Sequence, residues 1–568
     1  MDDTLKKLAE KYALYNAVKY RSPPRTESVL GKILSEHPEL RKDVKHVKEV
    51  VEEVVKALSD QRYEEWKKRL EEIAPEMLEH RKEKKPKKGL KELPNAVKGK
   101  VVMRFAPNPN GPPTLGSARG IILNSEYAKM YEGKFILRFD DTDPVNKRPL
   151  LEAYDWYIKD CSWLGAEPDE VVYASDRLEL YYEIAEELIR KGHAYMCFCS
   201  SEEFRILKAS KKACPHRDTS PKENMEWWRS ALDGELSPGS AVLRIKTDIT
   251  HPDPALRDFG AFRIVDVPHP RVGDKYRVWP LLDFESAVED HMLGITHILR
   301  GKELSDSEKR QKFIYSYLGW EYPVVVHWGR IKIHEFGRLS TSSLAKAIEE
   351  GVYGGWDDPR VPSVMAFRRR GIQAEAIRRF YLSLGVDESD ISVSLENLYA
   401  ENRKLIDPHA KRFFMVKNPL LVEVRGAEST VANPLVHPKR TERRKIEVRA
   451  VDGVARVYVE EDEFKQLPDG RTIRLKNLYI VRKEGDCFYH VKSEFVRGEL
   501  KKKKIKVIHW APEDGLDCLL RTPEGDYRGV CEREVANHVD EVVQFERVGF
   551  ARIDCVVKEG VVAYFAHK

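Results

Sequence analysis

Apolar residues recur at spacings of three and four near the start of the chain. One such stripe consists of Val44, Val47, Val51, Val54, Val55 and Leu58. A stripe of this kind predicts an amphipathic helix that packs by its apolar face, so residues 1 to about 80 are expected to be helical. Residues 81–100 then combine Pro and Gly with a run of Lys. This composition indicates a solvated linker or, alternatively, a contact with nucleic acid.

A strand, loop, helix and strand follow this segment. Residues 101–105 have the pattern of a short buried strand, 117–131 that of a helix, and 134–139 that of a second strand. This succession predicts a βαβ unit. Ligands of such units bind beyond the carboxyl ends of the strands, near the amino end of the helix. Residues 107–117 and 140–143 are therefore expected to border one crevice.

From about residue 405 onward the pattern of apolar residues becomes typical of β-strands. Short β-branched and aromatic segments, EVRAV, RVYVE, LYIVR and KVIHW, are separated by turn signals such as PDG, EGD and PEGD. The pattern predicts an all-β terminal region of barrels. The expected fold class is therefore multidomain, α/β plus all-β.

Composition adds a few limits. With 568 residues the chain exceeds what one hydrophobic core usually organises, so we expect about three to five domains. No run approaches the roughly 20 apolar residues that span a bilayer, and the amino end lacks a secretory pattern. We expect a cytoplasmic protein with no membrane association. The net charge of +5 is mild, but Lys and Arg are clustered, which favours an acidic partner.

Eight cysteines in a long chain of this kind favour free thiols or metal ligands over a disulfide framework. Four close ligands occur as CxC and CxH, namely Cys197, Cys199, Cys214 and His216. Three thiolates and one imidazole satisfy tetrahedral zinc, and with no open position the ion would be structural. Incidental cysteines near a surface histidine are the alternative.

Four further segments carry candidate chemistry. They are RFAPNPNGPPTLGSARG (104–120), LRFDDTDP (137–144), GRLSTSSLAKAIEEG (337–351) and GWDDPRVPSVMAFRRRG (355–371). In the first, Gly111 and Gly116 allow close approach of a phosphate-bearing ligand, and the helix amino end offers unpaired N–H groups. Taken alone, the third segment is only a polar turn or helix cap.

Together these segments resemble the glutamyl and glutaminyl subgroup of class I aminoacyl-tRNA synthetases, over about residues 99–568. The resemblance implies a Rossmann-type catalytic domain, with a helical amino-terminal extension and carboxy-terminal anticodon-binding β-barrels. The division it implies is 1–98 for the extension and linker, 99–196 and 276–335 for the two catalytic halves, 197–275 for an acceptor-stem-binding insertion, 336–405 for the KMSKS-like loop and connecting helices, and 406–568 for the barrels.

The same resemblance implies where ATP binds and reacts. The positions matching the family's ATP contacts are Pro107, Asn108, Pro109, Asn110, Gly111, Gly116 and Leu339. Those matching its HIGH and KMSKS catalytic elements are Thr114, Gly116, Ser117, Arg338, Ser340, Thr341 and Ser342. This chain departs from the family in three places, because Thr114 and Ser117 replace two histidines and the KMSKS lysine is missing. Hydroxyls cannot carry an imidazolium charge. Either Arg338 or Lys346 reaches the phosphates instead, or catalysis is impaired.

For the amino acid, the resemblance implies contacts from Arg104, Ala106, Asp140, Ser286 and Arg300. Asp140 is expected to hold the substrate ammonium, whereas Asp141 and Asp143 have a structural alternative as a capping turn. Arg300 decides the substrate, since glutamyl enzymes place an arginine there against the side-chain carboxylate. Leaving a buried guanidinium without its carboxylate would cost on the order of 2 to 5 kcal/mol, so glutamine should be rejected. A tyrosine common in the family aligns with Leu282.

Cationic and aromatic positions in the second half are expected to bind RNA, because cations bind phosphate and flipped bases stack on aromatic rings. The candidates are Arg360, Arg440, Arg443, Arg444, Lys503 and Trp510. Solvated charged surfaces are the alternative.

The implied activity is ATP-dependent activation of L-glutamate, with Mg²⁺, and transfer to tRNA(Glu) by a monomer. Whether tRNA(Gln) is a second acceptor stays open at this point. Two other hypotheses stay open at this point. A glutaminyl enzyme shares nearly every motif apart from Arg300, and a non-catalytic tRNA-binding relative would explain the missing histidines and lysine.

Overall fold

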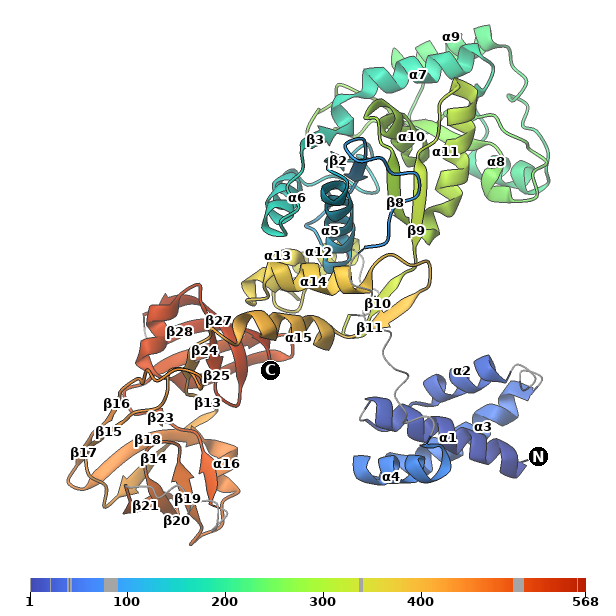
Figure 1. Cartoon of the computed structure of the whole chain (residues 1–568). Helices are drawn as coiled ribbons and strands as arrows, with labels where there is room; N and C mark the ends of the chain where they lie inside the picture. The colour runs from blue at the N-terminus through green and yellow to red at the C-terminus, as the bar shows by residue number, and fades with distance from the viewer. Residues whose placement is uncertain are drawn as a thin grey trace. The chain divides into compact units, whose positions relative to one another are not determined.

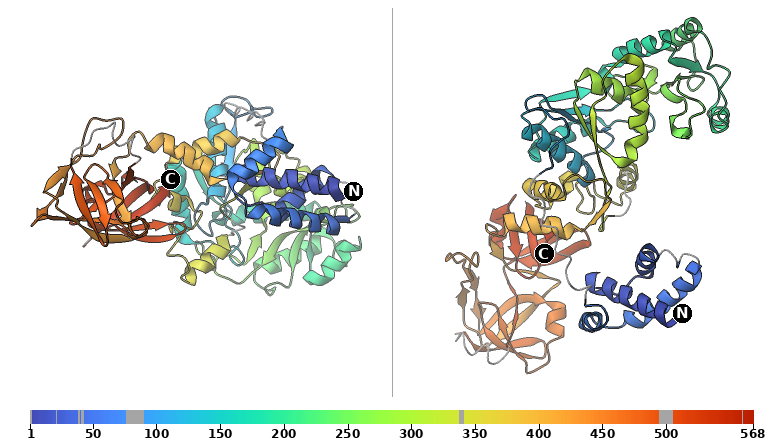
Figure 2. Two further views of the ribbon diagram at one scale, coloured as in Figure 1. Left: turned by 90° about the horizontal axis from the view of Figure 1, so that it is seen from below. Right: turned by 45° about the vertical axis from the view of Figure 1, so that its right-hand side comes forward.

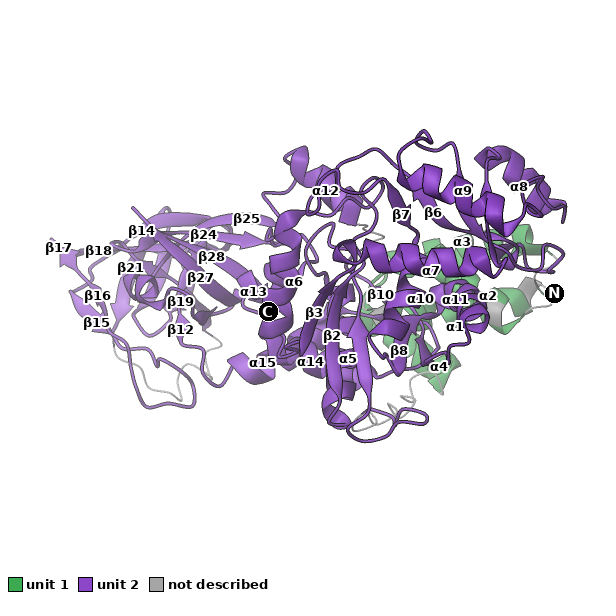
Figure 3. Ribbon diagram, turned by 90° about the horizontal axis from the view of Figure 1, so that it is seen from above, with its two compact units in different colours: residues 1–88 green, residues 89–568 purple. Residues whose placement is uncertain are grey.

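The computed structural model describes residues 2–20, 22–37, 40, 43–75, 90–336, 341–493, 505–558 and 560–568. The chain forms two compact units, residues 1–88 and 89–568 (Figure 3). The finer division of 89–568 stated above stays a prediction.

The first unit is helical, as predicted. Its helices are α1 (Asp2–Tyr20), α2 (Thr26–Glu36), α3 (Val44–Ser59) and α4 (Tyr63–Ile73). The stripe on α3 buries Val47, Val51, Val54 and Leu58, while Val44 at the helix start is 40% exposed. Trp66 packs beside them and donates from Nε1 to the carbonyl oxygen of Leu58 at 2.8 Å.

The second unit begins with a parallel sheet that confirms the predicted βαβ unit. Its elements are β1 (Val102–Phe105), α5 (Leu115–Met130), β2 (Lys134–Phe139), α6 (Leu151–Trp163), β3 (Glu170–Tyr173), β8 (His297–Gly301) and β9 (Val324–Trp328). β1, β2 and β3 pair in that order, and β8 pairs with β9, all parallel. The N–H of Thr296 donates to the carbonyl oxygen of Val102, so β8 lies beside β1. Strands β8 and β9 run side by side in Figure 1. Helix α5 starts at residue 115 instead of 117, because Thr114 caps it.

An insertion separates the two halves of this sheet. It contains α7 (Leu178–Arg190), β4 (Ala194–Cys197), α8 (Ser201–Ala209), α9 (Pro221–Leu232), β5 (Val242–Ile245), β6 (Phe259–Ile264) and β7 (Val278–Pro280). The four strands form an antiparallel sheet in sequence order. Helices α10 (Leu282–Met292) and α11 (Ser305–Leu318) lead out of β7 and β8. Helix α10 therefore joins the insertion to the parallel sheet.

Short elements follow the parallel sheet. They are β10 (Ile331–Ile333), α12 (Thr341–Glu349), α13 (Val364–Arg369), α14 (Ala374–Leu384), β11 (Ile391–Val393) and α15 (Leu395–Ile406). Val364, Phe367 and Phe380 share one core with Ile121 of α5 and Leu137 of β2. These two elements belong to the parallel sheet and its helices, called the nucleotide fold. The connecting helices are thereby fixed against α5.

The remaining chain is nearly all β, as predicted, and has two sheets with separate cores. The first β-body consists of β12 (Arg412–Phe413), β13 (Met415–Lys417), β24 (Leu516–Thr522), β25 (Gly525–Cys531), β26 (Val542–Phe545), β27 (Gly549–Val557) and β28 (Gly560–His567). The second β-body consists of β14 (Pro419–Arg425), β17 (Ala450–Val451), β18 (Val454–Glu460), β19 (Thr472–Leu475), β20 (Ile480–Glu484), β21 (Cys487–Lys492), β22 (Lys506–Ile508) and β23 (Ala511–Pro512) (Figure 2). It carries the hairpin β15 (Thr430–Ala432) and β16 (Ile446–Val448) and the short helix α16 (Glu461–Lys465).

Within the described part of the chain, no helix is both long enough and apolar enough to cross a membrane.

Candidate functional site

A cavity of about 760 Å³ lies where the carboxyl end of β2 meets the insertion. The nucleotide fold and α10 contribute Ala106, Asn108, Asp140, Thr142 and Glu285 to its wall, and the insertion contributes Phe204, Arg244, Phe259 and Arg263. Asn108 donates from Nδ2 to the carbonyl oxygen of Asp140 at 3.0 Å, and the N–H of Asp140 donates to Pro107 at 3.0 Å. The loops at the ends of β1 and β2 therefore form one edge, as expected for this strand order.

A buried ionic network stands behind this edge. Arg138, fully buried on β2, donates from Nε and Nη2 to the Asp140 carboxylate at 2.6 and 3.2 Å. Its Nη1 donates to Asp290 on α10 at 2.7 Å. Ser286 completes the link, since it accepts from Arg138 at 3.1 Å and donates to Asp140 at 3.0 Å. Asp140 is thus held in place from two sides.

Arg104 on β1 joins the same network. Its Nε and Nη2 donate to the two oxygens of Asp290 at 2.9 and 3.2 Å. Burial alone would raise the pKa of Asp290, but Arg104 and Arg138 outweigh it and lower the pKa to about 2. Asp290 is therefore ionised and orients both guanidinium groups.

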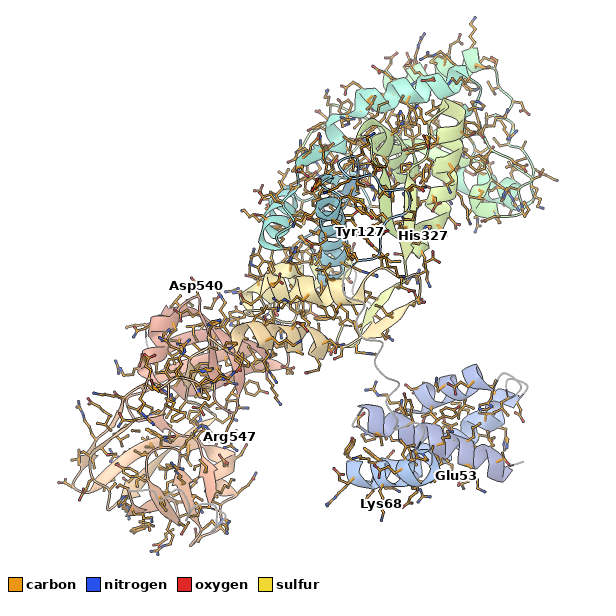
Figure 4. The ribbon with its side chains drawn as sticks, viewed as in Figure 1. Glu53, Lys68, Tyr127, His327, Asp540 and Arg547 are labelled. Carbon is orange, nitrogen blue, oxygen red and sulfur yellow. The ribbon has the colours of Figure 1, made fainter. Side chains whose placement is uncertain are left out.

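Arg300, on β8, is a buried cation with a different environment. It is 5% exposed, and its register partner on β9 is His327 (Figure 4). Its Nη1 donates to the neutral amide oxygen of Gln311 at 3.1 Å, and its Nε has no partner among the described residues. Burial lowers the pKa of Arg300, and the neighbouring charge of Arg104 acts in the same direction. Arg300 forms no ion pair with the described residues and does not line the first cavity, while the charges of Asp290 and Glu308 act against the lowering of its pKa.

The amino end of α5 presents the hydroxyls that stand at the two histidine positions. Thr114 is the N-cap and accepts from the N–H of Ser117 at 3.3 Å, and the two hydroxyls are 3.3 Å apart. Gly116 is exposed in the first turn. The N–H groups of Leu115, Ser117 and Ala118 already donate within the protein, so the exposed turn at Gly116 and the two hydroxyls are the groups suited to an anionic oxygen.

The third and fourth motifs lie against this loop. A β-carbon on Gly111 would be 2.4 Å from Cγ2 of Thr341 and 3.2 Å from the ring of Trp356. The N–H of Leu115 donates to Pro362, and that of Val364 donates to Pro113. Thr341 and Ser342 begin α12, whereas Arg338, Leu339 and Ser340 lie outside the described residues. Lys346 forms an ion pair with Glu350 at 3.6 Å.

The predicted cysteine and histidine ligands come together in the insertion. The ligand atoms of Cys197, Cys199, Cys214 and His216 all lie within 4.8 Å of one another. Sγ of Cys197 is 3.9 Å from Sγ of Cys214, and Sγ of Cys199 is 3.6 Å from Nδ1 of His216. Ligands at zinc distances of about 2.0 to 2.3 Å in a tetrahedron stand roughly 3.5 to 3.8 Å apart, so the donor set fits the ion.

The residues expected to bind RNA differ in their exposure to solvent and in the partners that they already have. Arg360 is exposed but bound to Asp358 through Nε at 2.8 Å and Nη2 at 2.6 Å, while Arg440 and Arg443 are exposed beside the hairpin of the second β-body. Lys503 lies outside the described residues.

Two of these expectations need correction, because neither side chain offers a surface. Trp510 is fully buried and donates from Nε1 to the carbonyl oxygen of Lys476 at 2.8 Å. Arg444 is 4% exposed and donates to both oxygens of Glu532 at 2.8 to 3.1 Å. The expected aromatic surface at Trp510 and the expected phosphate contact at Arg444 were therefore wrong.

Three site residues were missed by the sequence reasoning, namely Arg138, Glu285 and Asp290. A signal existed for the last two, because apolar Phe284, Ala287 and Val288 mark α10 as a buried helix. Acidic residues within such a helix need partners. No comparable signal connects Arg138 with Asp290, which lies 152 residues further along the chain.

Comparisons with known proteins agree with this architecture. Residues 100–408 match the catalytic domain of the family described as tRNA synthetases class I (E and Q), and residues 410–495 and 507–554 match its two anti-codon binding domains. The nucleotide fold with its crevice is thus that of a class I tRNA synthetase. The chain belongs to the E and Q family of these enzymes.

Relatives within that family can be named. The chain is 55% identical to proteins named glutamate–tRNA ligase from Methanosarcina acetivorans and from Methanosarcina mazei, in each case over 99% of both chains. A solved glutamate-tRNA synthetase from Elizabethkingia anophelis is 22% identical, covers 54% of this chain and 70% of that chain, and has a TM-score of 0.40.

Proposed function

We propose that the protein activates L-glutamate with ATP and transfers it to tRNA(Glu). The observation that carries the choice of amino acid is Arg300, a buried guanidinium that donates to the neutral oxygen of Gln311 and forms no ion pair with the described residues, although Asp290 and Glu308 lie near enough to favour its charge. Its missing counterion is supplied by the side-chain carboxylate of glutamate. Glutamine cannot supply that charge, and an unpaired buried cation is costly.

The other parts of the site have roles that follow from their positions. Asp140, fixed by Arg138 and Ser286, faces the cavity and accepts the α-ammonium group. Thr114, Ser117 and the first turn of α5 donate to the ATP phosphates, which arrive with Mg²⁺. Attack of the α-carboxylate on the α-phosphorus gives glutamyl-adenylate and pyrophosphate, and the terminal adenosine of tRNA then accepts the glutamyl group. Positioning and charge neutralisation carry the first step.

A second cavity supports tRNA as the partner. It has a volume of about 730 Å³ and lies between the two β-bodies, near Arg547 (Figure 4). Its charged lining residues are one acid, Glu546, and the cations Arg412, Arg443, Arg474, Lys476 and Arg547. A cationic groove between two anti-codon binding domains suits phosphate groups and unstacked bases.

For Cys197, Cys199, Cys214 and His216 we propose a zinc ion. When bound, zinc would tie the end of β4 to the 214–216 turn and support the insertion wall of the first cavity. Its role would be structural, because all four positions of a tetrahedron are filled by protein ligands.

The test is pyrophosphate exchange in the presence of tRNA(Glu), with glutamate or glutamine. We expect exchange with glutamate only, and a loss of at least about 100-fold in Arg300→Gln, corresponding to about 2.7 kcal/mol. Arg370→Gln is the matched control, since Arg370 is 3% exposed but bonds carbonyl oxygens of the first β-body. Exchange that survives in Arg300→Gln would refute the role of Arg300. No exchange by the wild-type protein would favour a non-catalytic tRNA-binding relative.

A further inference from the structure

Five carboxyl groups line the first cavity, and one of them differs from the rest. Asp140, Asp143, Asp258 and Asp283 each form an ion pair with an arginine, respectively Arg138, Arg263, Arg217 and Arg310. The fifth, Glu285, has no arginine partner among the described residues. Four cavity carboxylates are therefore neutralised by the protein, and Glu285 is not.

Glu285 has few partners of any kind. It is 1% exposed in the first turn of α10, and its Oε2 accepts from the Thr142 hydroxyl at 3.0 Å. Its Oε1 has no donor among the described residues. Leu282, almost one turn earlier on α10, lines the same wall but offers no polar side-chain atom. The wall beside Asp140 therefore contains one acceptor atom that lacks a donor.

The surroundings of Glu285 favour its protonated form. The Glu285 carboxyl lies within hydrogen-bonding reach of Asp140, and burial together with that neighbouring charge raises the pKa of Glu285 well above its usual range. Two adjacent carboxylates in a dry site cannot both stay ionised. Because Arg138 already binds Asp140 through two hydrogen bonds, the proton resides on Glu285.

The other charges around Glu285 do not replace this proton. On its own helix, Glu289 accepts from Arg177 and Tyr181 at 2.7 and 2.8 Å, and its charge also disfavours ionisation of Glu285. On β2, Arg138 is the cation that favours ionisation, but its hydrogen bonds go to Asp140, Asp290 and Ser286. Across the cavity, Arg263 and Arg310 form ion pairs with their own carboxylates. Of the other cations in the lining, Arg205 pairs with Glu202, Lys208 donates to the carbonyl oxygen of Asp258 and Arg244 lies over the ring of Phe204, while Lys147 also lines the cavity.

We propose that Glu285 is a further amino-acid-binding residue, whose carboxyl accepts the α-ammonium group of glutamate together with Asp140 and releases its proton to solvent on binding. In the balanced step, the O–H bond of Glu285 breaks and the proton passes to the buffer. The ammonium group, which keeps its three protons, donates to both carboxylates. This role rests on the proposed function, because it requires that glutamate binds in this cavity.

Proton release can be measured on the wild-type protein. L-glutamate is titrated calorimetrically into the full chain at pH 7 in two buffers of different ionisation enthalpy, which reports the protons exchanged per ligand. We expect about one proton released per glutamate. Glutarate, which lacks the ammonium group, is the matched ligand, and its binding should release none. Equal heats in both buffers for glutamate would overturn the proposal.

The pH profile of exchange separates a binding role from a merely structural one. Over the pH range in which Glu285 carries its proton, the KM for glutamate should fall by up to about tenfold for each unit of increase in pH. In Glu285→Gln, whose amide always carries hydrogen, this slope should vanish and KM at pH 8 should rise roughly tenfold or more, with kcat nearly unchanged. A variant with the wild-type slope would overturn the proposal.

Glu289→Gln is the matched control, because it places the same amide on α10 one turn away, at a residue that does not line the cavity. It should keep a slope of KM against pH but move that slope to lower pH, because the charge of Glu289 no longer disfavours ionisation of Glu285. Complete loss of the slope there would mean that the profile does not report on Glu285. Failure of the proposed function can be told apart from failure of the role of Glu285. In the first case the wild-type protein shows no glutamate-dependent pyrophosphate exchange. Intact exchange without proton release refutes only the role of Glu285.

Discussion

The methyl group of Thr341 occupies the space that a β-carbon on Gly111 would need, with only 2.4 Å between the two positions. Two motifs about 230 residues apart therefore touch at a point where one of them must be glycine. The contact fixes the start of α12 against the loop that precedes α5, and Trp356 closes it from the other side at 3.2 Å. Such a contact couples the position of the KMSKS-like segment to the loop that we propose binds ATP.

We expect Gly111→Ala to displace α12 and to lower kcat for pyrophosphate exchange by about tenfold or more, because a misplacement of about 1 Å can cost up to 100-fold. The double variant Gly111→Ala with Thr341→Ser removes the obstructing methyl group and should recover much of the loss. Steady-state exchange kinetics measure both.

Gly354→Ala is the control for adding a methyl group at a glycine outside the expected ATP contacts. A β-carbon there would lie 3.6 Å from Oδ2 of Asp358, an ordinary contact. If Gly354→Ala is as impaired as Gly111→Ala, or if Thr341→Ser gives no recovery, the packing explanation is wrong.

The ionic network behind the cavity predicts opposite pH dependences for two carboxyls. The pKa of Asp290 falls from its ordinary 3.8 to about 2 through Arg104 and Arg138, whereas burial raises the pKa of Asp141 to about 6. Asp290 thus contributes stability that is present above about pH 4 and lost as pH falls toward 2. That contribution is on the order of 2 kcal/mol. Asp141 favours the folded state at low pH, and its contribution is lost as pH rises from about 4 through 6.

Melting temperatures of the wild-type protein, Asp290→Asn and Asp141→Asn between pH 3 and pH 8 test both signs. Asp290→Asn should melt lower at pH 7, because it leaves two buried arginines underpaired, and its deficit should shrink toward pH 3. Asp141→Asn should instead lose the decline between pH 4 and pH 6. Parallel curves for all three proteins would show that neither carboxyl is linked to folding.

Features of the fold and the site that depend on residues close in the sequence could be predicted, whereas those that depend on contacts between distant segments could not. The strands 102–105 and 134–139 were predictable because their apolar runs are local, and Asp140 was placed at a strand end by the same pattern. Trp510 was misjudged, although a strand period of two puts it on the same side as buried Ile508, because the neighbouring lysines suggested a surface. Two features depend on contacts between distant segments, which no local pattern of residues encodes. They are the pairing of Arg138 with Asp290 and the position of Glu285 in the cavity wall.

The cavity between the β-bodies predicts a difference between two substitutions there. Arg443→Gln should weaken tRNA binding and lower the slope of log affinity against log salt by about one, because Arg443 is exposed and lines the cavity. Trp510→Phe should lower the melting temperature instead, since it leaves the carbonyl oxygen of Lys476 without its donor. Filter binding at several salt concentrations, together with thermal unfolding, separates the two effects.

Arg449→Gln is the control for loss of a surface cation, because its side chain is 85% exposed and does not line this cavity. It should leave the salt slope unchanged. Equal effects of Arg443→Gln and Arg449→Gln would indicate a diffuse electrostatic attraction instead of a binding site in the cavity.

The zinc proposal makes a prediction that extends from the metal to the first cavity. Phe198 lies between two ligands in sequence, and its ring meets those of His216 and Trp227 at centroid distances of 5.4 and 5.0 Å. Metal analysis of the purified protein should find one zinc per chain, and Cys199→Ser should lose most of it. Because α8 carries Phe204 into the cavity wall, the variant should raise the KM for tRNA or glutamate more than it lowers kcat. Cys487→Ser, at a half-buried cysteine of β21, should keep both the metal and the kinetics. A protein with no zinc and a fully ordered insertion by hydrogen exchange would show that the four side chains pack without an ion.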